Sequence, residues 1–217
     1  MKIGVFDSGM GGKSVANAIQ KALPADEVIY VSDDKNVPYG SKTSDEIYKL
    51  VLPILKDLAI KVDVIVVACN TVSTTLINPL REAIKTPLIA MEPMVKSAAE
   101  QTDSGIIAVC ATPTTLASKR YQWLKDSYAE GVTVLQPDCS DWSQMIESDT
   151  VNRQHVQERI EAVCQAGADV IVLGCTHYHW IEAMITEIAD DRAKVLQPEQ
   201  AVIRQLKRVI KEIEQPA

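Results

Sequence analysis

The sequence has few aromatic residues and few histidines, and it lacks a surplus of basic charge. It contains one Phe and three His among 217 residues, so aliphatic side chains must fill the core, as they do in buried parallel strands. The net charge of −7 disfavours nucleic acid and anionic membranes as partners. No apolar run reaches the roughly 18 residues of a membrane span. The early charges Lys2 and Asp7 disfavour a signal peptide.

Paired cysteines are also missing. The five cysteines are an odd number and none belongs to a Cys-x-x-Cys pair, which predicts free thiols in a reducing cytoplasm. The three histidines, His155, His177 and His179, do not stand at a metal-ligand spacing from the cysteines. We therefore expect no metal site.

The sequence does contain short apolar strands that alternate with amphipathic helices, which predicts the α/β class with parallel sheets. The predicted strands cover 3–7, 27–32, 64–68, 88–91, 106–110, 131–135, 169–173 and 193–196. The predicted helices cover 13–22, 44–60, 72–84 with an interruption near Pro79, 94–101, 116–128, 152–166, 179–189 and 199–213.

The first four strands and the last four follow one plan at a nearly constant offset. This repetition predicts two similar parallel-sheet α/β domains related by a pseudo-two-fold axis, with the active site in the cleft between them. We place the first domain at 1–95 and the second at 96–198. The C-terminal helix, 199–217, is expected to pack back on the first domain.

Two nine-residue segments, 63–71 and 169–177, echo each other. Both open with Asp-Val-Ile-Val, and both carry a cysteine where the strand ends, Cys69 and Cys175. Ligands of open α/β sheets bind outside the carboxyl ends of the strands. The helix that follows each cysteine is expected to lower the pKa of its thiol. Two such thiols on opposite sides of one ligand would suit removing a proton from one face of a carbon and returning one to the other face.

Polar residues at the strand ends are candidates for stabilising the negative charge that develops in such a reaction. Asp7 and His177 are placed to orient or assist one thiol each. The loop 37–41 presents the hydroxyl of Tyr39 and backbone amides. The other candidate donors are Ser8, Asn70, Thr71, Thr112, Thr115 and Thr176.

The chain resembles the glutamate racemases, within the aspartate/glutamate racemase superfamily, over nearly its whole length and in four motifs. These are Ile3-Gly-Val-Phe-Asp7-Ser8-Gly9-Met-Gly-Gly12, Val37-Pro38-Tyr39-Gly40, Ala68-Cys69-Asn70-Thr71 and Gly174-Cys175-Thr176-His177-Tyr178. The resemblance implies a racemase without cofactor that supplies D-glutamate for peptidoglycan, and hence for cell-wall biogenesis and cell shape. It also implies that a homodimer can form.

The resemblance also implies a role for each matching residue. Cys69 and Cys175 would be the acid/base pair, with Asp7 and His177 as assistants. Asp33 and Glu147 match acidic positions near the site. The implied substrate-binding residues are Ser8, Pro38, Tyr39, Gly40, Asn70, Thr71, Thr112, Thr115 and Thr176.

Three alternatives stay open. The same chemistry could act on aspartate or a related amino-acid derivative, and the sequence does not identify the residue that reads the substrate side chain. A binding protein could keep the cleft without turnover, although both thiols argue against it. A phosphate-handling enzyme built on the loop 7–12 is disfavoured, because no phosphate-loop lysine or set of metal-binding carboxylates accompanies the loop.

Overall fold

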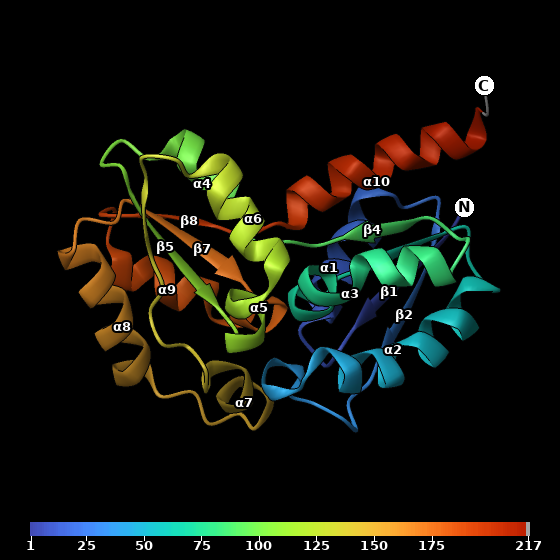
Figure 1. Cartoon of the computed structure of the whole chain (residues 1–217), viewed down its shortest axis with the longest axis horizontal. Helices are drawn as coiled ribbons and strands as arrows, with labels where there is room; N and C mark the ends of the chain where they lie inside the picture. The colour runs from blue at the N-terminus through green and yellow to red at the C-terminus, as the bar shows by residue number, and fades with distance from the viewer. Residues whose placement is uncertain (216–217) are drawn as a thin grey trace.

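The computed structural model describes residues 1–215 and contains two four-stranded parallel sheets. The strands are β1 (Lys2–Asp7), β2 (Glu27–Ser32), β3 (Val64–Val67), β4 (Leu88–Ala90), β5 (Ile106–Ala111), β6 (Thr133–Leu135), β7 (Val170–Gly174) and β8 (Lys194–Leu196). The first sheet has the order β2-β1-β3-β4 and the second has the order β6-β5-β7-β8. The second order repeats the first strand for strand, which confirms the predicted fold class (Figure 1).

Helices connect the strands and cover both faces of each sheet. They are α1 (Gly12–Ala22), α2 (Ser44–Ala59), α3 (Asn70–Ala83), α4 (Val95–Gln101), α5 (Pro113–Ala117), α6 (Lys119–Tyr128), α7 (Trp142–Glu147), α8 (Arg153–Gln165), α9 (Glu182–Ala189) and α10 (Glu199–Glu214), with the 3-10 turns η1 (Tyr39–Ser41) and η2 (Thr176–Ile181).

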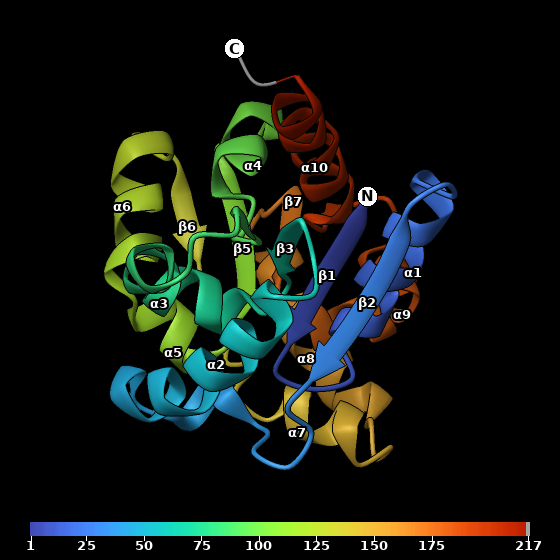
Figure 2. The ribbon, with the colours of Figure 1, turned by 90° about the vertical axis from the view of Figure 1, so that its right-hand side faces the viewer.

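In the first half, alternate side chains of β3 pack on opposite layers. Ile65 and Val67 lie in a buried cluster with α2 and α3, whereas Val64 and Val66 lie in a cluster with α1 and α10. This two-residue period on a strand buried on both faces explains why β3 is a continuous apolar run. Figure 2 shows α10 running along the first half close to β1 and the N-terminus.

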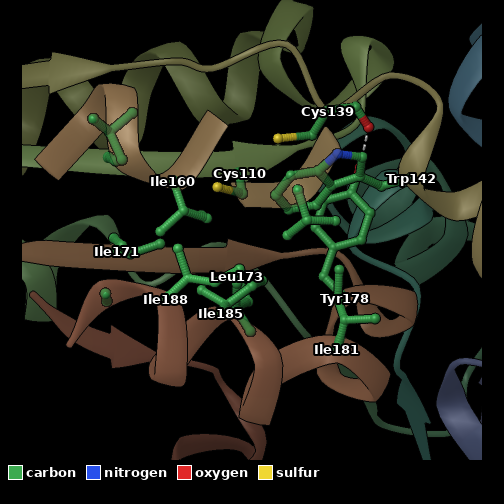
Figure 3. Packing of buried hydrophobic residues seen from close by; sticks show 14 of the residues in the cluster. Cys110, Cys139, Trp142, Ile160, Ile171, Leu173, Tyr178, Ile181, Ile185 and Ile188 are labelled. Atoms are coloured by element: carbon green, nitrogen blue, oxygen red, sulfur yellow. Dashed lines mark hydrogen bonds between the residues drawn. The ribbon is translucent and has the colours of Figure 1, made fainter. Parts of the chain in front are cut away.

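The second half is layered in the same way. One face of its sheet carries α4 and α6, and the other carries α7, α8, η2 and α9. In the latter layer the rings of Trp142 and Tyr178 meet edge to face, with centroids 5.2 Å apart, beside Cys110 and Cys139 (Figure 3). This aromatic pair fixes α7 against the segment that follows β7.

Three details of the predicted helices are wrong. α3 runs through Pro79 without interruption, with Leu76, Ile77 and Leu80 buried on its core side. The predicted helix 116–128 is two helices, because Ser118 is extended and caps α6 with its side chain. The short helix α7 was not predicted.

The domain limits stay a prediction. α4 begins at Val95 and packs in the cluster of the second sheet, so the predicted limit after residue 95 falls at the start of a helix. α10 packs with α1 on the first sheet through Val202, Leu206 and Ile210. The last two residues of the predicted helix 199–217 lie outside the described residues. No helix within residues 1–215 has both the length and the apolar character needed to cross a membrane.

Candidate active site

The two matched cysteines line one cavity between the halves. Cys69 follows β3 and stands at the N-cap of α3, and Cys175 follows β7 and stands at the N-cap of η2. The cavity has a volume of about 20 Å³. A larger hollow of about 510 Å³, with Lys125 and Val134 in its lining, contains none of the predicted site residues.

Most of the predicted site residues line this cavity. They are Ser8, Pro38, Tyr39, Gly40, Cys69, Asn70, Thr71, Thr112, Cys175, Thr176 and His177. Four predicted residues lie behind the lining and reach it through hydrogen bonds: Asp7, Asp33, Thr115 and Glu147. One further lining residue, Ser143, was not predicted.

Cys69 is held as a neutral thiol. Its Sγ donates to Oγ of Ser8 at 3.4 Å. Burial, followed by the charge of Asp7, raises the pKa of Cys69 to about 12, although the Ser8 hydroxyl and the N–H of Val72 oppose that rise. The predicted lowering of the pKa is therefore wrong for Cys69, because desolvation outweighs the N-terminus of α3.

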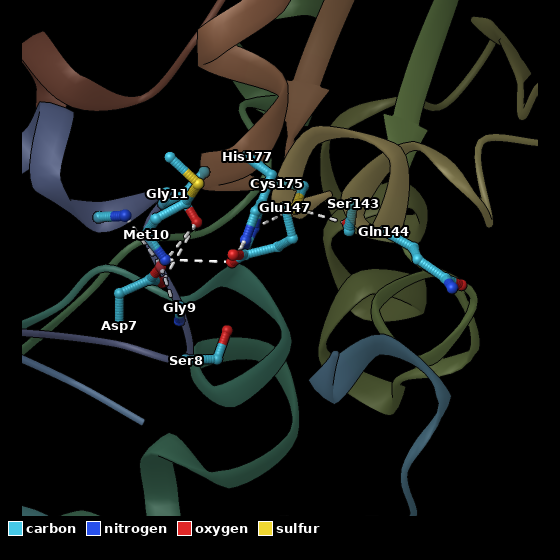
Figure 4. A network of polar contacts seen from close by, with 12 residues as sticks. Asp7, Ser8, Gly9, Met10, Gly11, Ser143, Gln144, Glu147, Cys175 and His177 are labelled. Carbon is cyan, nitrogen blue, oxygen red and sulfur yellow. Dashed lines mark hydrogen bonds and ion pairs between the residues drawn. The ribbon is translucent and has the colours of Figure 1, made fainter. Parts of the chain in front are cut away.

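Cys175 lies beside a cation instead. Its Sγ is 3.7 Å from Nδ1 of His177 and 3.6 Å from Oγ of Ser143. Nε2 of His177 bonds Oε1 of Glu147 at 2.5 Å (Figure 4). Burial lowers the pKa of His177, but hydrogen bonds with Cys175 and Glu147 outweigh it and raise that pKa to about 11. A protonated imidazole next to a thiol favours the thiolate.

Asp7 supports the loop after β1 rather than touching a thiol. Its carboxylate accepts from the N–H of Gly12 at 2.8 Å and from the hydroxyl of Thr176 at 3.2 Å. The side chain is fully buried, and burial raises the pKa of Asp7, while the charge of His177 opposes the rise. Within residues 1–215, no hydrogen bond joins Asp7 to either cysteine, so it acts on Cys69 through its charge.

Asn70 is the cavity residue with spare hydrogen-bonding capacity. Both polar atoms of its side chain are buried and have no partner in the described part of the chain. An unpaired buried amide is costly, so Asn70 is well suited to bind a polar ligand. Beside it, the hydroxyl of Thr71 lies 3.0 Å from that of Thr112 and 3.3 Å from that of Thr115, which joins the two halves.

The loop before α2 supplies another part of the lining. The hydroxyl of Tyr39 donates to Oδ2 of Asp33 at 2.6 Å, and the amide of Asn36 holds the same carboxylate. The hydroxyl of Tyr39 therefore already has an acceptor in Asp33 and is not available to donate to a ligand. The buried ring of Tyr39 forms part of the cavity wall. The carbonyl of Gly40 accepts from the hydroxyl of Thr114 at 2.6 Å, across the seam between the halves.

The contacts that depend on how the halves meet could not be predicted from the sequence. The N–H of Met10 donates to Oε1 of Glu147 at 3.1 Å, and this bond ties the first loop to α7. A Cβ on Gly11 would lie 2.7 Å from the backbone N of His177, so only glycine lets the loop approach η2 this closely. The glycines of the loop signalled a close approach, but no sequence feature signalled α7.

No group of three or more His, Cys, Asp or Glu side chains suited to a metal ion occurs among residues 1–215. In this cavity the thiol of Cys175 instead contacts the imidazole of His177, which in turn binds the carboxylate of Glu147. The arrangement is suited to moving protons.

Comparison with known proteins agrees with this chemistry. The model of the Asp/Glu/hydantoin racemase family matches residues 4–206. A glutamate racemase of Herpetosiphon aurantiacus is 37% identical over 215 residues, which cover 96% of this chain and 84% of that protein.

Solved structures give the same result. The crystal structure of Escherichia coli glutamate racemase in complex with L-glutamate and the activator UDP-MurNAc-Ala matches with a TM-score of 0.87 at 26% identity, covering 97% of this chain and 82% of that one. Glutamate racemase of Francisella tularensis in complex with D-glutamate matches with a TM-score of 0.83 at 28% identity, covering 98% of this chain and 82% of that one.

Proposed function

We infer that this chain, which belongs to the Asp/Glu/hydantoin racemase family, interconverts L- and D-glutamate by proton transfer at Cα. It is an isomerase. Two glutamate racemases of similar fold bind L-glutamate and D-glutamate, which supports a small acidic amino acid as the ligand. The observation that carries the mechanism is the pair of thiols in one cavity, one beside a carboxylate and the other beside a protonated imidazole.

We propose that each thiol takes one proton role in each turnover. The Cys175 thiolate removes the α-proton from one face of the substrate, and the Cys69 thiol donates its proton to the opposite face. The product leaves with inverted configuration, and the enzyme is left with a Cys175 thiol and a Cys69 thiolate. The reverse reaction uses the thiols in these exchanged roles.

The remaining site residues have supporting roles in the proposal. His177, held by Glu147, stabilises the thiolate of Cys175, and burial together with the charge of Asp7 keeps Cys69 protonated. Charge that develops on the substrate carboxylate needs donors already in place, and the unpaired amide of Asn70 is the best placed of these. Asp33 acts through Tyr39. The other proposed contacts to substrate come from Ser8, Pro38, Gly40, Thr71, Thr112 and Thr176, and Thr115 acts through Thr71 and Thr112.

The biological setting is also a proposal. We propose that the D-glutamate enters peptidoglycan synthesis in the cytoplasm, which is supported by the family and by the five free cysteines. We propose the division into domains 1–95 and 96–198, supported by the two sheets. A homodimer remains a prediction, and light scattering of the purified protein over a range of concentrations would test it.

The test is to incubate each enantiomer of glutamate and of aspartate with the protein in deuterated water. We expect the α-proton NMR signal of both glutamate enantiomers to disappear while the circular dichroism decays to zero. Decay with aspartate and not with glutamate would assign aspartate as the substrate instead. Absence of deuterium uptake with both amino acids would overturn the proposal that the protein is a racemase.

A further inference from the structure

Ser143 is the cavity residue that neither thiol motif includes. We propose that Ser143 is a positioning residue for Cys175, whose hydroxyl donates a hydrogen bond to the Cys175 thiolate and holds Sγ facing the cavity. A serine also contacts the other thiol, at 3.4 Å against 3.6 Å here, although there Sγ of Cys69 donates and Oγ of Ser8 accepts. The inference rests on the proposed function, because it assigns Ser143 to the same reaction.

The position of Ser143 follows from the short helix α7. Ser143 and Glu147 stand four residues apart and so lie on one face of the helix. Ser143 contacts Sγ of Cys175, and Glu147 binds the ring of His177 (Figure 4). One turn of α7 therefore serves both members of the thiolate–imidazolium pair.

The hydroxyl of Ser143 can make this bond: Sγ of Cys175 is 3.6 Å away, and the hydroxyl of Tyr178 is the other polar group that it approaches. A serine within a helix commonly donates to the carbonyl four residues earlier, as Ser148 does to Gln144 at 2.8 Å. For Ser143 that carbonyl belongs to Cys139, and it already accepts from the hydroxyl of Tyr178 at 2.7 Å. Ser143 is itself only 6% exposed, so its hydroxyl is shielded from bulk water.

Other ionisable groups near Cys175 do not supply this bond. The hydroxyl of Tyr178 is committed to Cys139, and burial raises the pKa of Tyr178 well above its usual value. His177 contributes its charge and one ring nitrogen. The titratable groups that face Cys175 directly or through His177 are His177, Tyr178, Cys69, Asp7, Glu147 and His179. None of them is a hydroxyl free to donate, so the role falls to Ser143.

The direct test is alkylation by iodoacetamide as a function of pH, followed cysteine by cysteine with mass spectrometry. A hydrogen bond to a thiolate favours ionisation, so Ser143→Ala should move the Cys175 profile to higher pH and lower its alkylation at neutral pH about tenfold. The Cys69 profile should stay in place. Ser143→Thr, which keeps the hydroxyl, should restore the parent profile for Cys175.

Two controls define the outcome. Ser148→Ala removes a hydroxyl from the end of the same helix, away from both thiols, and should change neither profile. Ser8→Ala should move the Cys69 profile and not that of Cys175. Superimposable Cys175 profiles for the parent and a folded Ser143→Ala variant would overturn the inference.

Kinetics separate this inference from the proposed function. In the direction that uses Cys175 as base, Ser143→Ala should lower kcat for glutamate about tenfold with little change in KM, and the acidic limb of the pH profile should move upward. An unchanged acidic limb would count against the positioning role. A parent protein that does not racemise glutamate would overturn the proposed function, and the alkylation profiles would still decide the contact between Ser143 and Cys175.

Discussion

Cys69 and Cys175 stand at equivalent strand ends of two sheets with the same strand order, yet their surroundings are electrically opposite. Cys69 has the buried carboxylate of Asp7 nearby and a pKa raised to about 12. Cys175 contacts the imidazole of His177, whose pKa is raised to about 11 and which is therefore a cation at neutral pH. The duplicated scaffold places the two sulfurs, and the loops around them give each sulfur a different charged neighbour.

This difference is what a two-thiol racemase requires. If both thiols were charged, no acid would be available, and if both were neutral, no base would be available. Side chains from both halves contribute to the difference, since the carboxylate of Asp7 comes from β1 and also accepts from Thr176 after β7.

The largest effect should come from removing either member of the pair. Cys69→Ala and Cys175→Ala should each lower racemisation of glutamate about a thousandfold or more, because each deletes one of the two proton carriers. Circular dichroism of the reaction measures the loss. Cys164→Ala, which removes a thiol on α8 outside the cavity, should retain parent activity. A racemisation rate above a tenth of the parent in either cavity variant would refute the two-thiol mechanism.

A smaller effect should follow from removing the cation beside Cys175. His177→Asn should lower kcat about a hundredfold, since the thiolate loses the charge that stabilises it. Glu147→Gln, which keeps a hydrogen-bond acceptor for the ring, should lower kcat less. The matched control is His155→Asn, because His155 lies near the surface and pairs with Asp141. Equal kcat values for His177→Asn and the parent would show that the charge of His177 does not support the reaction, contrary to the proposed electrostatic difference between the two thiols.

Neutralising Asp7 should reduce the electrostatic difference between the surroundings of the two thiols. The charge of Asp7 helps to raise the pKa of Cys69, so Asp7→Asn should lower that pKa and speed the alkylation of Cys69 at pH 9. We expect about a tenfold increase in that rate. The alkylation of Cys110, buried in the second half, provides the internal reference. An unchanged rate at Cys69 would show that burial alone keeps it neutral.

The smallest expected effect is on stability in alkali. An unfolded cysteine ionises near pH 9, whereas folded Cys69 stays neutral up to about pH 12. The native state therefore keeps the proton of Cys69 to a higher pH than the unfolded state does. The stabilisation that Cys69 contributes is lost as the pH rises from 9 towards 12. The free energy of unfolding should fall by about 1 kcal/mol more between pH 9 and 10 in the parent than in Cys69→Ala.

Urea unfolding at the two pH values measures this slope. The control is Ile77→Val, a core substitution in α3 that removes no titratable group and should leave the slope as in the parent. If Cys69→Ala and Ile77→Val show the same slope, Cys69 is not the group that titrates.

Much of the fold could be predicted because the strands are buried on both faces. The run Val64–Val67 is apolar at every position, and its copy at Val170–Leu173 repeats the pattern, so strand type and duplication follow from local sequence. Pro79 misled the helix prediction, since burial of Leu76 and Leu80 holds α3 together across a proline that would end an isolated helix.

The site was predictable as far as it consists of strand ends and glycine-rich loops. α7 was not, because its six residues are too few to show a helical period and its N-cap residue, Asp141, makes no side-chain capping bond. Tertiary packing holds α7 at the site, because Trp142 of α7 packs on Tyr178 of η2. The neutral state of Cys69 was missed for a related reason, since burial depth depends on tertiary structure.

The cavity between the thiols has room for about one water molecule and not for an amino acid. An amino acid could therefore enter only if the lining moved, and contacts across the seam such as that between Met10 and Glu147 are those that such a movement would break. While the halves stay together, a proton on Cys69 or Cys175 has almost no solvent with which to exchange. The lifetime of the closed state thus sets how long a deuteron taken from the substrate stays on a cysteine before it exchanges with solvent. Such retention would appear as delayed washout of deuterium at high substrate concentration.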